Sequence, residues 1–170
     1  ELKKGQIKVI KVDKENHEIK IPNVVFEVQD SKGNILEKIT TDENGEALTS
    51  KYPLRDYSSL RLHEIETDEK YALENEIKEI TLEENQIKDI QIENEKIKGY
   101  IQIVKTSKED NKINGNKKGE ALEGVKFEIY AINGNLIQKL TTDSKGIAKS
   151  KELEKGIYKV KEVETNEWYL

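Results

Sequence analysis

An amine, a carboxyl and a carboxamide each stand at the end of a row of alternating apolar residues. They are Lys11 after Ile7 and Val9, Glu64 after Leu60 and Leu62, and Asn94 after Ile90 and Ile92. Successive side chains of a strand point to opposite faces, so each polar group shares the inward face of its row. An independent charge or an unpaired amide is costly to bury. Three such groups that converge on one core suggest chemistry among themselves.

Each of these residues also has a simpler interpretation. A lysine at the end of an edge strand is usually solvated, and asparagine often ends a strand as a turn residue. Glu66 shares the inward parity of Glu64, so periodicity alone does not choose between the two glutamates. The residues by themselves therefore leave two hypotheses open, a reactive set and a set of ordinary strand-end residues.

Short β-strands are the elements that would position these groups. Apolar residues recur mostly at every second position, which is typical of half-buried strands and outweighs the abundance of Glu and Lys. Turn signals separate the strands, which is the pattern of an all-β sandwich. The strands predicted in the first half are 7–13, 24–28, 35–41, 47–49, 59–65, 77–82 and 87–93. The last two are expected to pair as a hairpin across residues 83–85.

Neither turns nor histidines suggest a metal site. The segments 31–34 and 42–45 each contain a glycine, which supplies the positive φ that tight turns need. The second segment superficially resembles a calcium loop but lacks the twelve-residue ligand pattern, so a plain turn is expected. His17 and His63 have no Cys or His partner at ligand spacing and are expected at the surface. The sequence predicts no metal ion and no cofactor.

The second half of the chain repeats the first. The strand around Phe26 is matched by one around Phe127, and a Thr-Thr-Asp-x-x-Gly-x-Ala turn occurs in both halves. Lys105 and Glu162 take the positions of Lys11 and Glu64. The repeat is about 95 residues long, which is the size of a domain rather than of a solenoid unit. We therefore expect two tandem domains, residues 1–97 and residues 98–170.

The second domain is expected to lack its last strands. Its copy of the repeat stops at Leu170, just after the strand that carries Glu162, so no counterpart of Asn94 follows. We therefore predict that Lys105 does not react within the chain. Because open sheet edges recruit strands, this domain is expected to be truncated or to pair with a strand-donating chain.

Composition argues against several functional classes. The formal net charge is −5, and Lys and Glu alternate rather than cluster, so there is no basic stripe for nucleic acid and no cationic helix for a membrane surface. The absence of cysteine rules out disulfides and thiolate chemistry in this chain. No apolar run approaches the length of a membrane span. With Glu at position 1 and no methionine, we interpret the chain as an internal piece of a longer polypeptide.

At these residues the chain resembles the collagen-adhesin B-type (Cna B-type) repeats of Gram-positive surface proteins and sortase-assembled pilins. The elements that match are the opening 5–13 strand, the Val-x-Phe-Glu strand, the Thr-Thr-Asp turn, and Glu64 placed seven residues before Tyr71. Lys105, Glu162 and Tyr169 match in the second half. The resemblance covers essentially the whole chain, and its specificity lies in the ordered set.

The resemblance implies two tandem immunoglobulin-like (prealbumin-like) β-sandwich domains and a spontaneous isopeptide bond. Lys11 would be the nucleophile, Asn94 the electrophile and Glu64 the proton shuttle, with Lys105 and Glu162 in the corresponding places of the second domain. Burial favours the neutral, nucleophilic form of an amine. Folding would hold the reacting groups in contact, which makes the reaction intramolecular.

The resemblance also implies a function. It indicates a structural stalk or spacer of a cell-surface adhesin or pilus, located outside the cell at its surface or wall, which crosslinks itself and turns over no substrate. Its expected partners are neighbouring repeats of the same polypeptide, with a host matrix protein or a strand-donating chain as further candidates. The alternative is an adhesin module that contacts a host ligand through its loops. The polar loop 107–120 favours a spacer.

Overall fold

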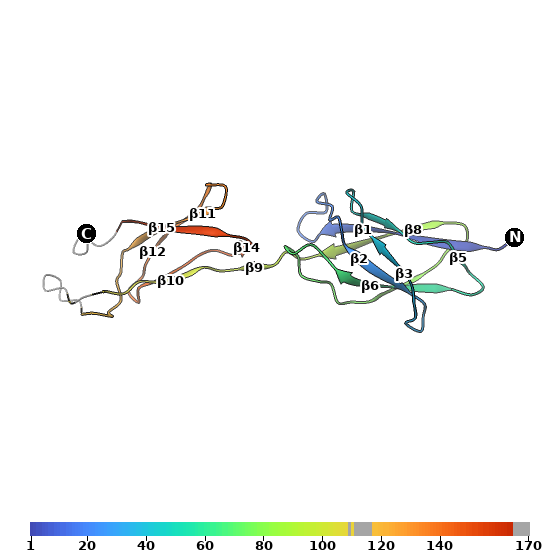
Figure 1. Cartoon of the computed structure of the whole chain (residues 1–170), viewed down its shortest axis with the longest axis horizontal. Helices are drawn as coiled ribbons and strands as arrows, with labels where there is room; N and C mark the ends of the chain where they lie inside the picture. The colour runs from blue at the N-terminus through green and yellow to red at the C-terminus, as the bar shows by residue number, and fades with distance from the viewer. Residues whose placement is uncertain (109, 111–116, 165–170) are drawn as a thin grey trace. The chain divides into compact units, whose positions relative to one another are not determined.

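The structure is a computed structural model that describes residues 1–108, 110 and 117–164, and its regular elements there are all β-strands (Figure 1). The chain divides into two compact units, Glu1–Ile97 and Lys98–Leu170. Within the described ranges, no helix is long and apolar enough to cross a membrane.

One sheet of the first unit is built around its first strand. β1 (Lys4–Asp13) pairs antiparallel with β4 (Glu46–Leu48) and β5 (Tyr52–Pro53), and parallel with β8 (Ile87–Asn94). The parallel ladder runs from the pair Gln6 and Ile87 to the pair Asp13 and Asn94. The first and last strands of the unit therefore lie side by side (Figure 1).

The second sheet of this unit is antiparallel throughout. Its order is β3 (Ile35–Thr40), β2 (Val25–Gln29), β6 (Ser59–Glu66) and β7 (Lys78–Thr81). The strand bounds differ from the predicted ones by at most three residues at either end, because alternation defines faces better than ends. The two-residue strand β5 was not predicted, because it is too short to show a period.

The expected hairpin between residues 77–82 and 87–93 is wrong. β7 pairs with β6 and β8 pairs with β1, so the two strands belong to different sheets. The connection between them crosses from one sheet to the other and is held on β1, where the N–H of Asn85 donates to the carbonyl of Lys4 at 2.7 Å. A connection of this length suits a hairpin or a crossover equally well, and the parallel ladder with β1 decides for the crossover.

The core of the first unit lies between the two sheets. The rows predicted to face inward do so: Ile7, Val9, Leu60, Leu62 and Ile92 are at most 2% exposed. Phe26 of β2 is 1% exposed and belongs to the same cluster. Full burial of each such side chain contributes about 1.5–3 kcal/mol. This apolar packing surrounds the polar residues that end the rows.

A glycine turn fixes the backbone beside Lys11. Gly45 has φ +71° and follows Asp42, whose Oδ1 accepts hydrogen bonds from the N–H groups of Asn44 and Glu46 at 2.9 and 3.0 Å. The carbonyl of Gly45 accepts the N–H of Lys11 at 2.8 Å. A Cβ at Gly45 would lie 2.8 Å from the Lys11 carbonyl oxygen, so the close approach requires glycine. This is the plain turn that the sequence predicts.

The second unit follows the same plan in its described part. Its strands are β9 (Lys98–Gly99), β10 (Gln102–Val104), β11 (Lys126–Ala131), β12 (Leu136–Thr141), β13 (Ile147–Lys149), β14 (Leu153–Glu154) and β15 (Tyr158–Glu164). They form sheets with the orders β12-β11-β15, β10-β13 and β14-β9, and the buried cluster between them includes Val125, Phe127 and Ile129.

The middle residue of the inward row of β15 is exposed to solvent. Val160 is 44% exposed, whereas Leu62, its counterpart in the first unit, is 1% exposed. Up to residue 164, where the description ends, β15 is the last strand. Tyr169 lies outside the described residues.

Candidate functional site

Lys11, Glu64 and Asn94 meet inside the first unit. Lys11 and Asn94 come from the neighbouring strands β1 and β8 of one sheet, and Glu64 comes from β6 of the other. Their exposed fractions are 0%, 1% and 2%. The structure thus brings the three candidate residues together in the core, as the inward rows predict.

The amine of Lys11 contacts both of the other groups. Its Nζ lies 2.7 Å from Oε1 of Glu64, and it donates a hydrogen bond to Oδ1 of Asn94. The same Nζ lies 5.8 Å from the ring centroid of Phe26, within the range of a cation–π contact. The amine is therefore enclosed by one carboxyl, one carboxamide and one aromatic ring.

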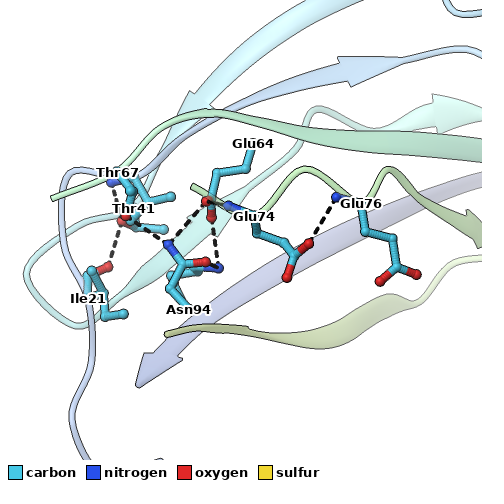
Figure 2. Close-up of polar contacts among 9 residues, drawn as sticks. Ile21, Thr41, Glu64, Thr67, Glu74, Glu76 and Asn94 are labelled. Atoms are coloured by element: carbon cyan, nitrogen blue, oxygen red, sulfur yellow. Dashed lines mark hydrogen bonds and ion pairs between the residues drawn. The ribbon is translucent and has the colours of Figure 1, made fainter. Parts of the chain in front are cut away.

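The carboxyl of Glu64 bridges the amine and the carboxamide. While Oε1 faces Lys11, Oε2 accepts a hydrogen bond from Nδ2 of Asn94 at 3.1 Å and another from the backbone N–H of Glu74 at 2.7 Å. Nδ2 of Asn94 also donates to Oγ1 of Thr67 at 2.8 Å. Figure 2 shows the Asn94 side chain between Glu64 and Thr67. One carboxyl group can thus exchange protons with both nitrogens.

Burial changes the acid–base behaviour of Lys11. Loss of hydration lowers the pKa of its amine below the ordinary lysine value, and the hydrogen bond and charge of Glu64 oppose that shift without cancelling it. A lowered pKa makes the neutral amine more accessible than in an exposed lysine. The neutral amine is the form that can act as a nucleophile.

The structure also separates the two glutamates that parity leaves equivalent. Glu64 is buried beside Lys11, whereas Glu66 is exposed. A register irregularity opposite Val25 and Phe26 lies between them, because Glu66 pairs with Val25 and Glu64 with Phe26. An irregularity of this kind breaks the two-residue period at the end of β6.

In the second unit only two of the corresponding groups come together. Lys105 and Glu162 approach to 3.5 Å between Nζ and Oε1, and their side chains are 27% and 29% exposed. In the described ranges of this unit, no carboxamide side chain hydrogen-bonds to either group. The distance between the two groups is longer, and their side chains are more exposed to solvent, than in the pair of Lys11 and Glu64.

A buried acid close to the site was not predicted. Asp13, 1% exposed, accepts a hydrogen bond from the hydroxyl of Tyr71 at 2.8 Å and lies 3.7 Å from Nζ of Lys96. Burial alone would raise the pKa of Asp13, but its hydrogen bonds, with Tyr71 first, and the nearby lysine together lower it. Asp13 pairs with Asn94 in the parallel ladder, so this contact anchors the end of β1 beside the site.

Thr67 and the backbone N–H of Glu74 were also missed. Both belong to the irregular segment after β6, whose contacts no periodicity reveals. A signal for Thr67 was present, because a threonine follows each glutamate at the same distance, as Thr67 after Glu64 and Thr165 after Glu162. Thr165 lies outside the described residues.

Each of the two histidines lies beside one glutamate. His17 is exposed and contacts Glu93, and His63 is half-buried with its Nδ1 3.3 Å from Glu27. In the part of the chain that the structure describes, no cluster of three His, Cys, Asp or Glu side chains could hold a metal ion.

The sequence profile of a known family covers nearly the whole chain. The family described as SpaA, prealbumin-like fold domain, matches residues 5–96 and 99–170. The chain belongs to this family. The expected all-β, prealbumin-like fold and the resemblance to pilin-like repeat domains are thereby confirmed.

Solved structures show the same fold. The TIE protein of Bacillus anthracis matches with a TM-score of 0.79 and 28% identity over 95% of this chain and 29% of its own. This chain therefore spans less than a third of that protein. The major pilin subunit of Bacillus cereus matches with a TM-score of 0.52 and 10% identity over 94% of this chain and 87% of its own, a likeness of fold alone. No curated protein sequence is a significant match.

Family membership supports a structural role in a pilus or another surface protein. It also supports a location outside the cell or at its surface.

Proposed function

We propose that this chain is a stalk or spacer segment of a Gram-positive cell-surface adhesin or pilus, and that its first unit crosslinks itself through an isopeptide bond between Lys11 and Asn94. The observation that supports the bond is the burial of an amine, a carboxyl and a carboxamide in mutual contact, with 2.7 Å between Lys11 Nζ and Glu64 Oε1. Isolated buried charges are costly, and conversion of the amine to an amide removes one.

The reaction begins with proton transfer. Lys11 Nζ passes a proton to Oε1 of Glu64, which leaves a neutral amine and a protonated carboxyl. The lone pair of Nζ then attacks Cγ of Asn94, and the electrons of the carbonyl bond move to Oδ1. The contacts of Lys11 with Glu64 and Asn94 hold all three groups within reach, so no diffusional encounter is needed.

The tetrahedral adduct then collapses. Glu64 gives its proton to Nδ2 of Asn94, with which its Oε2 is already hydrogen-bonded at 3.1 Å, and takes a proton from Nζ. The bond between Cγ and Nδ2 breaks, the carbonyl re-forms, and ammonia leaves. One C–N bond forms and one breaks, and the carboxyl ends protonated. The chain modifies itself once, so we propose no enzymatic turnover.

The bond would close a large covalent loop. Lys11 and Asn94 are 83 positions apart and lie on the first and last strands of the unit. By analogy with a disulfide, closing a loop of this size stabilises the fold by about 4–5 kcal/mol. Force that enters through β1 would pass across the bond and leave after β8, so the chain between them carries no load. This suits a stalk, attached to the cell wall, whose partners are the neighbouring repeats of the same polypeptide.

Intact mass under denaturing conditions tests the bond. The full chain is expected to be lighter than its sequence by one ammonia, and Glu64→Gln is expected to have the full mass. Glu66→Gln is the matched control, because Glu66 is exposed on the same strand and should leave the loss of ammonia intact. Fragmentation should join the peptides that contain Lys11 and Asn94. A wild-type chain at full mass would contradict the proposal.

A further inference from the structure

The leaving nitrogen of the proposed reaction has two hydrogen-bond acceptors. Nδ2 of Asn94 donates to Oε2 of Glu64 at 3.1 Å and to Oγ1 of Thr67 at 2.8 Å (Figure 2). A carboxamide nitrogen carries two N–H groups, so both are used. Two acceptors on one planar group define the plane of the carboxamide, and that plane sets the direction from which Cγ can be attacked.

The other two contacts of the carboxamide do not hold this plane through the reaction. They are the hydrogen bonds of Nδ2 to Glu64 and of Lys11 Nζ to Oδ1, and both partners exchange protons as the reaction proceeds. The torsion about the Cβ–Cγ bond is itself soft. A carboxyl that changes protonation during the reaction also changes between acceptor and donor. Thr67 does not change protonation, and its β-branched side chain has few rotamers. It can therefore hold the nitrogen in place while Glu64 moves protons.

The backbone around Thr67 is tied to the segment that follows Asn94. Tyr71 N–H donates to the carbonyl of Asp68 at 3.0 Å, Ala72 N–H to that of Glu95 at 2.8 Å, and Ile97 N–H to that of Lys70 at 2.8 Å. The loop after β6, which contains Thr67, also supplies the backbone N–H of Glu74 to the carboxyl of Glu64. The loop after β6 thus closes on the carboxamide and on the carboxyl together.

We propose that Thr67 is a positioning residue for the isopeptide reaction, which holds the leaving nitrogen of Asn94, and with it the plane of the carboxamide, beside Lys11 and Glu64. This rests on the proposed function of the site. The Thr67 hydroxyl neither gains nor loses a proton during the reaction. Its contribution is to keep the carboxamide in one orientation until ammonia leaves.

The test is the rate at which newly made chains lose ammonia. Full chains are produced by cell-free synthesis, stopped in denaturant at timed intervals, and analysed by intact mass. Thr67→Val keeps the shape of the side chain and removes the acceptor, and it is expected to slow the loss about tenfold, the effect of one lost hydrogen bond. Thr67→Ser restores the hydroxyl and is expected to recover most of the rate.

Two controls separate positioning from structure. Thr81→Val makes the same exchange at an exposed position of β7 and should react like the wild type. Urea unfolding of Thr67→Val in the Glu64→Gln background measures the stability of the unreacted fold. A positioning role predicts an altered reaction rate in chains that remain fully folded before the transition.

Each outcome of the rate measurement either supports or overturns the proposed role of Thr67. A wild-type chain that never loses ammonia overturns both the bond and the role of Thr67. A wild-type chain that reacts while Thr67→Val reacts equally fast overturns only the role of Thr67. Equal slowing by valine and serine also overturns it, because the hydroxyl would then not be what matters. Slowing by valine with recovery by serine supports it.

Discussion

The carboxylate of Asp13 accepts a hydrogen bond of 2.8 Å from the hydroxyl of Tyr71, 58 positions further along the chain. Asp13 is the last residue of β1, and its other oxygen accepts the N–H groups of Glu15 and Asn16 at 2.7 and 3.0 Å. The contact therefore joins the end of β1 to the loop that carries Thr67 and Glu74. It closes the end of the sandwich where Lys11, Glu64 and Asn94 meet.

Removing the Tyr71 hydroxyl should weaken this closure. Tyr71→Phe deletes one hydrogen bond to a buried carboxylate, so the free energy of unfolding should fall by about 1.5–3 kcal/mol. We would measure it by urea unfolding in the Glu64→Gln background, where no covalent loop restrains the unfolded chain. Tyr57→Phe, at a partly buried tyrosine of the same unit, is the matched control. Equal stability with and without the Tyr71 hydroxyl would contradict the assignment.

The same pair predicts how stability depends on acid. Because the pKa of Asp13 is lowered in the folded chain, its contribution is fully present above the ordinary value of 3.8 and is lost as the pH falls through the folded value. Tyr71→Phe removes one cause of that lowering. The fall in stability between neutral pH and pH below 3.8 should therefore be smaller in Tyr71→Phe than in its parent.

Mechanical unfolding should distinguish the crosslinked unit from the open one. Lys11 and Asn94 are 83 positions apart, so an open chain between them can lengthen by roughly 280 Å at about 3.4 Å per residue. In single-molecule pulling from the two ends, Glu64→Gln should show this extension for the first unit, and the wild type should not. A wild-type chain that releases the same length would carry no covalent bond between these strands.

The rate of ammonia loss should decline in alkali. The reaction needs one proton shared by Lys11 and Glu64, and that proton must reach the leaving nitrogen. Since burial lowers the pKa of Lys11, the pair loses this proton at a pH below the ordinary lysine value of 10.5. When the timed synthesis is repeated over a pH series, the rate of ammonia loss should begin to fall at a pH below 10.5. A rate that begins to fall only at or above 10.5 would mean that the Lys11 amine reacts while it is hydrated.

Alanine at Gly45 should disturb the site through the backbone of Lys11. A Cβ there would meet the Lys11 carbonyl oxygen at 2.8 Å in addition to the strain of φ +71°. Gly33→Ala is the matched control, because Gly33 has φ +89° but its nearest neighbour is the flexible end of Arg61 at 3.3 Å. Both should lose about 1 kcal/mol through strain, and Gly45→Ala should lose more. Thermal unfolding in the Glu64→Gln background compares them.

The second unit should contribute no loss of mass. Lys105 and Glu162 are 3.5 Å apart and partly exposed, and in the described ranges no carboxamide hydrogen-bonds to them. We therefore expect a single ammonia to leave the whole chain, and Lys105→Ala to leave that loss unchanged. Loss of two ammonia molecules, one of them abolished by Lys105→Ala, would show that the second pair also reacts.

Alternation explains which parts of the site could be predicted. In a strand the side-chain period is two, so Ile7 and Val9 fix the face of Lys11 as soon as they are buried, and the same holds for the rows that end at Glu64 and Asn94. These rows predicted the core and the convergence of the three groups. Parity alone did not distinguish Glu64 from Glu66, although the spacing to Tyr71 favoured Glu64, and in the structure Glu64 is buried while Glu66 is exposed.

The pairing of β8 and the contacts made by the loop after β6 could not be predicted, because they depend on the path of the connecting segments and not on which face of a strand a residue occupies. Pairing of β8 with β1 instead of β7 depends on the path of residues 82–86, and their composition suits either path. Thr67 and Tyr71 act from an irregular loop, where no period relates a residue to its neighbours. The contact of Tyr71 with Asp13 joins distant parts of the chain and has no local signature.

The parallel ladder of β1 and β8 has a consequence for the order of events during synthesis. β1 is the first strand of the unit to be made and β8 the last, yet each is the other's neighbour. Pairing of such distant segments is slow, because the chain between them must be ordered first. The proposed bond between Lys11 and Asn94 can therefore close only after the whole first unit has been made and its first and last strands have paired.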